Sequence, residues 1–316
     1  MMSDIAKHLG VSKTTVSRAF SGDGRISAKT KERILKYADE VGYFPNAAAR
    51  NLATARTKNI AFSMPLSRDS TRSAYFLQCL FGAKKVASQY GYDVIIEGDK
   101  LEPISRIVYS RKADGVILTR NIIGNAALER LSESGIPIAL TGSTPVENII
   151  KVGYDGRAAC KDLTMRLLER WPGDFGLIIT QQEYPVNQMR AQGFCDAFTC
   201  LGLPLPYISW DVDTEEEAAN AFRNMYNRGI RNIVCGDDVI CQYMLIVQNT
   251  LKGSLSDKIN IASFYSNHHL ETFHPDIPVV QMEPQRLGEI ACNMLIQRIE
   301  GNDVSLSTVL DYNLRL

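Results

Sequence analysis

The sequence predicts a small all-α head followed by a larger α/β body made of two doubly wound lobes. Three observations support this prediction. The first 45 residues contain short amphipathic helical segments separated by turn residues. From residue 59, apolar strand-like runs alternate with helical segments, and this alternation occurs twice. Residues 1–58 carry 11 Lys/Arg against 5 Asp/Glu, whereas the rest of the chain carries 24 against 30.

The uneven charge favours a head that binds a polyanion, although a solvated basic face is the alternative.

Seven cysteines without a CxxC spacing indicate reduced thiols rather than a metal site. The polar N-terminus predicts no signal peptide, and no apolar run reaches the roughly 18 residues of a membrane span. We therefore expect a cytoplasmic protein. No GxGxxG, P-loop, HExxH or GxSxG motif occurs, so we expect no enzyme, no cofactor and no metal.

Three helices are expected in the head, each preceded by small polar residues that can accept a backbone N–H. The expected caps are Ser3 or Asp4, then Ser12, then Ser27. Glycines should end the first and third helices, because glycine tolerates the left-handed conformation found there. These glycines are Gly10 and Gly42.

The segment from Ile5 to Arg18 has the spacing of a helix-turn-helix. Ala6 is small enough for two helices to cross closely, and Val16 is expected to pack against the first helix. The outward residues of the second helix would be polar, as required of a helix that enters a major groove. They are Lys13, Thr14, Ser17 and Arg18. A small helical hairpin with polar residues outside is the alternative.

Residues 46–56 have high helix propensity but almost no apolar face. An isolated helix of about ten residues is marginal in water. We therefore expect a linker that becomes helical only when something supports it.

The body is expected to contain two sets of mostly apolar strands, as is typical of parallel sheets buried on both faces. The first set is 60–64, 93–97, 115–119, 137–140 and 151–153; the second is 176–180, 207–209, 232–235, 260–264 and 279–281. Helices are expected near 72–90, 102–112, 124–134, 157–170, 187–201, 214–228, 239–252 and 285–300. Ligands of such sheets bind at the carboxyl ends of the strands, so we expect a site between the lobes.

The head strongly resembles the DNA-binding head of the LacI/GalR family of bacterial repressors. The resemblance covers nearly all of residues 3–56 and includes IAKHLGVSKTTVSRAFSG and ISAKTKERILKYADEVGYFPNAAARNLAT. It implies a repressor that reads a pseudo-palindromic operator as a homodimer. It also implies that Lys13, Thr14 and Arg18 face base edges. Implied phosphate contacts are Ser12, Thr15, Ser17, Tyr43 and Asn46.

In proteins similar to this one, the segment matching residues 46–55 folds into a hinge helix on DNA. The resemblance implies that Leu52 wedges into the minor groove, while Ala48 and Ala49 let two such helices approach. A leucine on the protein surface, or one docked on its own domain, is the alternative for Leu52.

The body resembles the family more loosely, with the two-lobed fold of periplasmic binding proteins. The stretch from Val152 to Asp155 resembles the crossover into the second lobe, and Arg190-x-x-Gly193-Phe194 resembles the family's R-x-x-G-F. The resemblance implies that a small effector, a sugar or sugar derivative, binds between the lobes. Implied effector contacts are Tyr75, Phe76, Asp155, Arg190 and Asp238. The alternatives are a surface arginine for Arg190, a helix cap for Asp238 and core packing for the two rings.

Some positions depart from the family pattern. Ser263-Phe264-Tyr265-Ser266 replaces G-F-D-D, Gly142-Ser143-Thr144 replaces D-R, and Asp237 replaces the asparagine of N-D. These departures remove an acid that the family pattern places at the edge of the cleft. Arg120 follows an expected strand, so it is a further candidate contact and favours an anionic ligand.

We expect three segments: a head over 1–45, a hinge over 46–57 and an effector-binding and dimerisation body over 58–316. Lobe 1 would span about 58–156 and 284–302, and lobe 2 about 157–283 and 303–316. A dimer is favoured over a tetramer because no heptad extension follows Leu316. The alternative function is a solute-binding or sugar-processing protein with an incidental helical head. A corepressor-dependent protein, in which the ligand tightens operator binding, is a variant of the repressor hypothesis.

Overall fold

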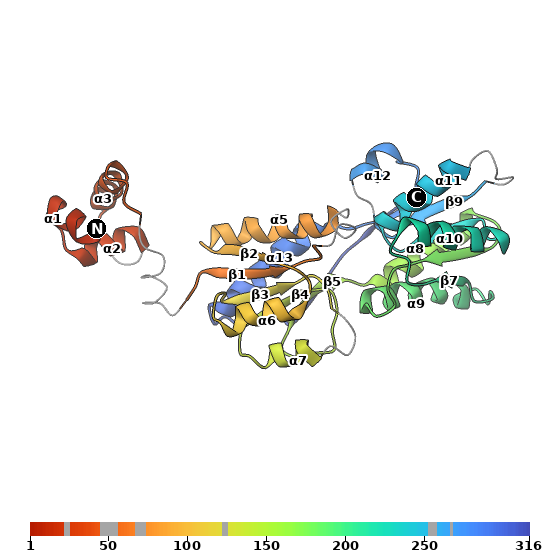
Figure 1. The fold of residues 1–316 in the computed structure, drawn as a ribbon, viewed down its shortest axis with the longest axis horizontal. Helices are drawn as coiled ribbons and strands as arrows, with labels where there is room; N and C mark the ends of the chain where they lie inside the picture. Colours follow the sequence, from red (N-terminus) through yellow and green to blue (C-terminus); the bar gives the residue numbers. More distant parts are fainter. Residues whose placement is uncertain (22–25, 45–55, 67–73, 122–125, 252–257, 266–267) are drawn as a thin grey trace. The chain divides into compact units, whose positions relative to one another are not determined.

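A computed structural model describes residues 1–21, 26–44, 56–66, 74–121, 126–251, 258–265 and 268–316 (Figure 1). The chain divides into two compact units, Met1–Thr57 and Lys58–Leu316. None of the described helices combines the length and the apolar character that crossing a membrane requires.

The first unit contains three helices, α1 (Met2–Leu9), α2 (Lys13–Ser21) and α3 (Ala28–Glu40). They enclose a small core made of Ile5, Ala6, Val16, Ala19, Ile34 and Ala38. Gly10 ends α1 at φ 64°, in the predicted left-handed conformation. The Ser12 and Ser27 hydroxyls accept the predicted capping bonds, from the backbone N–H groups of Thr15 and Thr30.

The predicted cap at Ser3 or Asp4 is wrong. Helix α1 begins at Met2, so Asp4 lies inside its first turn. The Asp4 carboxylate accepts a 2.8 Å hydrogen bond from the amino group of Met1. A carboxylate in this position also interacts favourably with the positive end of the helix dipole.

The first sheet of the second unit is entirely parallel, with the strand order β11-β5-β4-β3-β1-β2. Helices α5 and α13 cover one face, and α6 and α7 cover the other (Figure 1). Its strands are β1 (Asn59–Ser63), β2 (Asp93–Glu97), β3 (Gly115–Leu118), β4 (Ile138–Thr141), β5 (Ile150–Tyr154) and β11 (Ser307–Leu310). Its helices are α5 (Ala74–Gln89), α6 (Leu101–Tyr109), α7 (Ala126–Ser132) and α13 (Pro284–Ile299).

The second sheet has the order β12-β10-β9-β8-β6-β7 and is parallel except for the β10–β12 pair. Helices α8 and α9 pack on one face, whereas α10 and α11 pack on the other. Its strands are β6 (Phe175–Ile178), β7 (Tyr207–Ser209), β8 (Asn232–Cys235), β9 (Asn260–Ser263), β10 (Val279–Gln281) and β12 (Asn313–Arg315). Its helices are α8 (Gly156–Arg170), α9 (Pro185–Cys200), α10 (Glu215–Asn227), α11 (Asp238–Leu251) and α12 (His268–Phe273).

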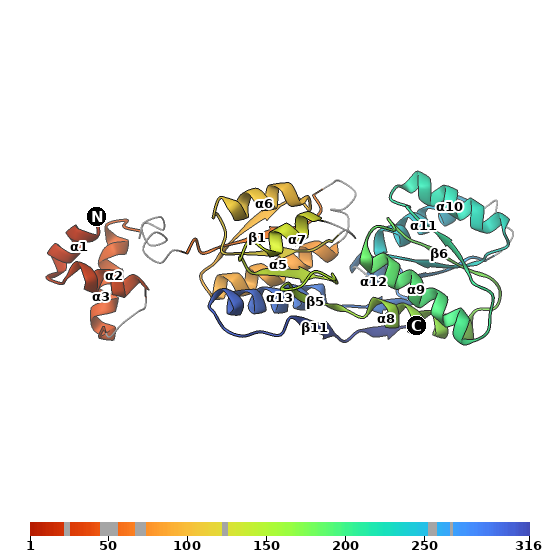
Figure 2. The same ribbon diagram turned by 90° about the horizontal axis from the view of Figure 1, so that it is seen from below.

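The chain crosses between the sheets after β5, after β10 and after β11 (Figure 2). Two of these crossovers are joined, because the Glu283 N–H donates a 2.7 Å hydrogen bond to the Tyr154 hydroxyl. The assignment of all residues from 303 to 316 to lobe 2 is wrong. Residues Ser307–Leu310 pair with β5 and extend the first sheet, and only Asn313–Arg315 join the second.

The sequence predicts no helix between the strands near 260–264 and 279–281, but His268 and His269 form the first turn of α12. The buried side chain of Leu270 joins the apolar core under α10 and α11. This apolar contact stabilises a six-residue helix whose sequence is largely polar.

Candidate functional site

The exposed face of α2 carries the residues predicted to read DNA. Lys13, Thr14, Ser17 and Arg18 are exposed, whereas Val16 and Ala19 of the same helix are buried. The predicted division of α2 into an inner apolar face and an outer polar face is therefore confirmed. The outer face offers hydroxyl, ammonium and guanidinium donors, which suit phosphates and base edges.

Several predicted phosphate contacts also stabilise the head itself. The Ser12 hydroxyl caps α2 and shares a 2.8 Å hydrogen bond with the Thr15 hydroxyl. Tyr43 is partly buried, and its ring tilts against Phe20 at 5.8 Å between centroids. The predicted contacts Asn46, Ala49 and Leu52, and with them the hinge helix, lie outside the described residues.

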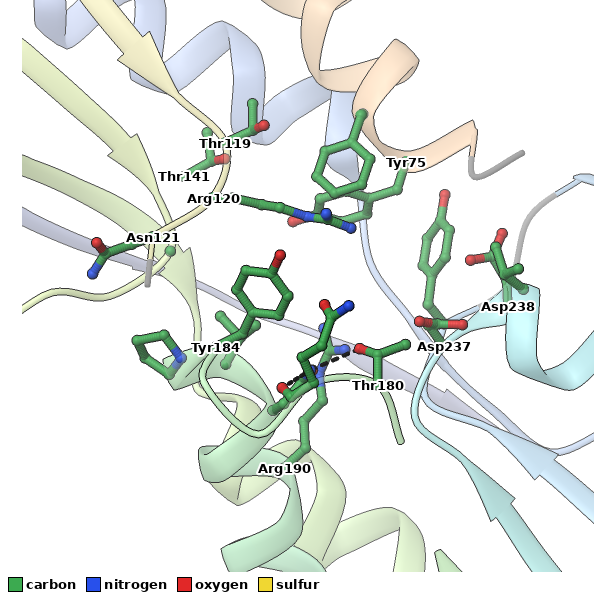
Figure 3. Close-up of a pocket in the computed structure, with 18 of the residues that line it drawn as sticks. Tyr75, Thr119, Arg120, Asn121, Thr141, Thr180, Tyr184, Arg190, Asp237 and Asp238 are labelled. Atoms are coloured by element: carbon green, nitrogen blue, oxygen red, sulfur yellow. Dashed lines mark hydrogen bonds between the residues drawn. The ribbon is translucent and has the colours of Figure 1, made fainter. Parts of the chain in front are cut away.

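A cleft of ≈410 Å³ lies between the two lobes of the second unit, and its lining follows the carboxyl ends of strands from both sheets (Figure 3). This size falls within the range of pockets that hold small ligands. Five of the six predicted effector contacts line it: Tyr75, Phe76, Arg120, Arg190 and Asp238. The two doubly wound lobes thus place their strand ends where the topology predicted.

Asp155 is the sixth predicted contact, and it does not line this cleft. Its carboxylate accepts a 2.9 Å hydrogen bond from the Ala158 N–H and caps α8. It borders a neighbouring cavity of ≈320 Å³, whose wall also includes Arg190. Its cap position explains why an aspartate follows the crossover, independently of any ligand.

Arg190 is fixed in the wall of the cleft by contacts within its own lobe. Its Nη1 atom donates a 2.9 Å hydrogen bond to the Gly236 carbonyl, and its guanidinium lies 4.2 Å from the centre of the Phe264 ring. Burial lowers the pKa of Arg190, and the negative charges of Asp237 and Asp238 partly oppose this shift. The alternative of a surface arginine is therefore wrong.

Gly193 explains part of the R-x-x-G-F pattern in physical terms. A Cβ atom at this position would overlap the carbonyl of Arg157. Glycine therefore lets α9 approach the backbone of α8 closely, and this contact holds the helix that carries Arg190.

Asp237 and Asp238 have different roles at the start of α11. The Asp237 carboxylate accepts a 2.9 Å hydrogen bond from the Ile240 N–H and caps the helix. The residue that caps α11 is therefore Asp237 and not Asp238, for which a cap was the alternative role. Asp238 is the first residue of α11, is 1% exposed and lines the cleft.

Arg120 links the two lobes across the cleft. Its guanidinium lies 5.1 Å from the Phe76 ring of lobe 1 and 5.0 Å from the Tyr184 ring of lobe 2. It also forms a 3.4 Å ion pair with Asp99. The arginine predicted to attract an anion therefore already has a carboxylate partner.

Several cleft residues were not predicted from the sequence, namely Asp99, Thr141, Tyr184, Asp213 and Tyr265. Tyr265 stands where the family pattern has an acid, and its ring meets Tyr75 edge to face at 5.4 Å. Asp213 accepts a 2.6 Å hydrogen bond from Gln181, and burial raises the pKa of its carboxyl. The available signal was their position, because Asp99, Thr141 and Asp213 end or follow strands β2, β4 and β7.

Comparison with known proteins supports this arrangement. Residues 1–46 match the model of the bacterial regulatory proteins of the lacI family. Residues 65–314 match the model of periplasmic binding proteins and the sugar binding domain of the LacI family.

Similar curated proteins include the HTH-type transcriptional regulator IdnR of Escherichia coli, 26% identical over 98% of this chain and 94% of that protein. Catabolite control protein A of Staphylococcus aureus is 24% identical over 98% of this chain and 97% of its own length.

Solved structures with a similar fold include a Lac repressor bound to ONPG in the repressed state. It has a TM-score of 0.83 at 17% identity and covers 100% of this chain and 98% of its own. The complex of the transcriptional regulator CelR with cellobiose has a TM-score of 0.74 at 21% identity. The match covers 100% of this chain and 98% of the CelR chain. From its helix-turn-helix head to its two-lobed body, the chain belongs to the LacI family of bacterial transcriptional regulators.

Proposed function

We propose that this chain is a repressor that binds a pseudo-palindromic operator as a homodimer and is controlled by a sugar-like effector. The observation that carries the proposal is the union, in one chain, of an outward polar helix in a helix-turn-helix and a ligand-sized cleft between two lobes. A DNA-binding head does not need a ligand cleft, and a ligand-binding body does not need a DNA-binding head. Together they fit a protein that converts ligand binding into a change in DNA affinity.

The proposed DNA contacts are those of the head. Arg18 would bond a guanine with two donors, an arrangement that discriminates between bases. Lys13 and Thr14 would face neighbouring base edges, while Ser12, Thr15, Ser17, Tyr43 and Asn46 would hold phosphates. Residues 46–57 would form the hinge, with Leu52 wedged in the minor groove and Ala49 facing the second copy. A Lac repressor dimer bound to operator is among the solved structures with this fold.

The proposed effector site is the cleft of the second unit. Tyr75 and Phe76 offer ring faces to a sugar, and Arg190 and Asp238 offer a donor and an acceptor for hydroxyl groups. CelR, which has the same fold, is solved in complex with cellobiose. A ligand that touches both lobes would favour one relative orientation of the lobes over another.

Coupling between the two sites must be reciprocal. If the effector lowers operator affinity by some factor, operator DNA must lower effector affinity by the same factor. We propose that the chain acts by binding rather than catalysis, and that it works in the cytoplasm, where the operator is. The titration described next determines whether the effector lowers operator affinity, as an inducer does, or raises it, as a corepressor does.

The test is a fluorescence anisotropy titration of the purified full chain against the promoter region upstream of its own gene. We expect binding that is stoichiometric with a dimer and that shifts with a sugar added in excess. A scrambled duplex of equal length is the control for non-specific binding. Equal affinity for both duplexes under every condition would overturn the proposal.

A further inference from the structure

The side chains that line the cleft include more carboxylates than guanidiniums. Among the described lining residues there are four carboxylates, Asp99, Asp213, Asp237 and Asp238, and two guanidiniums, Arg120 and Arg190. Both guanidiniums are already engaged. Arg120 pairs with Asp99, and Arg190 bonds Gly236 while interacting electrostatically with Asp237 and Asp238. The described wall of the cleft therefore carries a surplus of negative charge.

The aromatic rings of the cleft are suited to a cation. The guanidinium of Arg120 lies between the rings of Phe76 and Tyr184, at 5.1 and 5.0 Å from their centres. This arrangement is cation–π contact on two faces. Further rings in the lining are those of Tyr75, Tyr243 and Tyr265. Carboxylates interleaved with aromatic faces form the surroundings that stabilise a positively charged ligand.

One buried hydroxyl in the wall lacks a partner. Thr141 is 6% exposed, and its Oγ1 atom has no hydrogen-bond partner among the described residues. A buried hydroxyl left without a bond is destabilising, so a ligand that supplies one gains affinity. Thr141 lines the cleft at the end of β4 (Figure 3), and this points to a ligand that itself carries hydroxyl groups.

We propose that the effector is a polyhydroxylated molecule bearing a protonated amine, such as an amino sugar, rather than a sugar acid or sugar phosphate. The inference rests on the proposed function, since it specifies the ligand of that cleft. An anionic sugar would lose water beside Asp213 and Asp238, while Arg120 already pairs with Asp99 and the charge of Arg190 is opposed by Asp237 and Asp238. An ammonium would meet the surplus carboxylates directly.

Asp213 is the most informative of these carboxylates. It comes from the loop after β7 and is held by Gln181 at 2.6 Å. Burial raises the pKa of its carboxyl, and the charges of Glu217 and Asp237 raise it further. A cation placed beside it would relieve this repulsion.

The experiment is isothermal titration of the full chain with four matched probes, in the gluco, galacto and manno series. The probes are the hexose, the 2-amino-2-deoxyhexose, the uronate and the hexose 6-phosphate. In at least one series we expect the amine to bind about tenfold more tightly than the hexose, and the two anions to bind most weakly. Tightest binding of a uronate or a phosphate, or no binding of any amine at millimolar concentration, overturns the proposal.

A pair of variants separates recognition of the ligand's charge from a general effect of removing one negative charge from the protein. Asp213→Asn keeps the size of the side chain and an acceptor for Gln181, and should reduce the ratio of amine affinity to hexose affinity. Glu216→Gln removes one charge from the exposed face of α10 and is the matched control. Equal amine preference in both variants and the unmodified chain also counts against the proposal. Operator binding is measured separately, so failure of the ligand class is distinguishable from failure of the regulator function.

Discussion

The guanidinium of Arg190 is bonded to the carbonyl of Gly236 at 2.9 Å, which ties helix α9 to the turn that carries Asp237 and Asp238. The same turn is tightly packed, since a Cβ atom on Gly236 would lie 2.7 Å from Cγ1 of Ile179. One arginine thus fixes the positions of two carboxylates as well as its own. Arg190 is therefore a positioning residue of the cleft wall, and the proposed function makes it a ligand contact as well.

Replacing this arginine by lysine keeps the charge but removes the planar set of donors. For Arg190→Lys we expect a loss of about 1–3 kcal/mol in the free energy of unfolding, from the lost bond to Gly236. The thermal stabilisation by any hexose or hexosamine that binds the unmodified chain should also disappear. Arg157→Lys is the control, because Arg157 pairs with Asp196 on the exposed side of the same lobe. Unchanged ligand affinity in Arg190→Lys would contradict the role assigned here.

Gly193 tests whether the close contact between α8 and α9 matters for stability. In Gly193→Ala the new methyl group would overlap the Arg157 carbonyl, so the helices must separate. We expect the free energy of unfolding, measured by urea titration, to fall by about 1–3 kcal/mol. Gln192→Ala, on the exposed face of α9, should change stability by only a few tenths of that. A stable Gly193→Ala chain would show that the helices can move apart at little cost.

The elements of the body were predictable because most strands are buried on both faces and read as apolar runs. Strand β11 was missed because Ser307 and Thr308 begin it and because it lies at the edge of its sheet. Helix α12 was missed because two histidines open it and a single buried leucine anchors it. In both cases tertiary packing, rather than local pattern, determines the structure.

The site was predictable where a residue belongs to a local motif or, as with Arg120, follows an expected strand. Arg190 and Asp238 belong to short patterns and do line the cleft. Asp155 also belongs to one, but the motif there reflects a helix cap. The pairing of Arg120 with Asp99 joins residues 21 positions apart, and its second ring comes from the other lobe. No pattern in the sequence indicates such contacts, because they depend on how the lobes assemble.

Asp213 predicts a pH dependence of stability. Its folded-state pKa is raised from the ordinary 3.8, chiefly by burial, so the folded protein holds this proton more tightly than the unfolded chain. Its contribution to stability is therefore present at low pH and is lost as the pH rises above 3.8 through the folded-state value. Urea unfolding of Asp213→Asn across this range should lose that component of the pH profile. Asp276→Asn, at an exposed position, is the control; identical profiles for both variants would refute the assignment.

The Tyr184 ring tests the contact of Arg120 across the cleft. Tyr184→Phe keeps a ring face for the guanidinium, whereas Tyr184→Leu keeps only apolar bulk. We expect the leucine variant to unfold more easily than the phenylalanine variant by about 0.5–1 kcal/mol. Equal stability of the two variants in urea would indicate that the ring provides packing only.

Arg18 tests whether the exposed face of α2 reads bases. In Arg18→Ala the loss of two donors to one guanine should weaken specific binding by about 1–3 kcal/mol, measured by anisotropy on the promoter duplex. Binding to a scrambled duplex should weaken far less, because that binding depends on phosphate neutralisation shared among many cations. Lys36→Ala removes an exposed charge from α3 and should change the ratio of specific to non-specific affinity little. Parallel losses on both duplexes in Arg18→Ala would mean that this side chain contacts the backbone of the DNA and carries no sequence information.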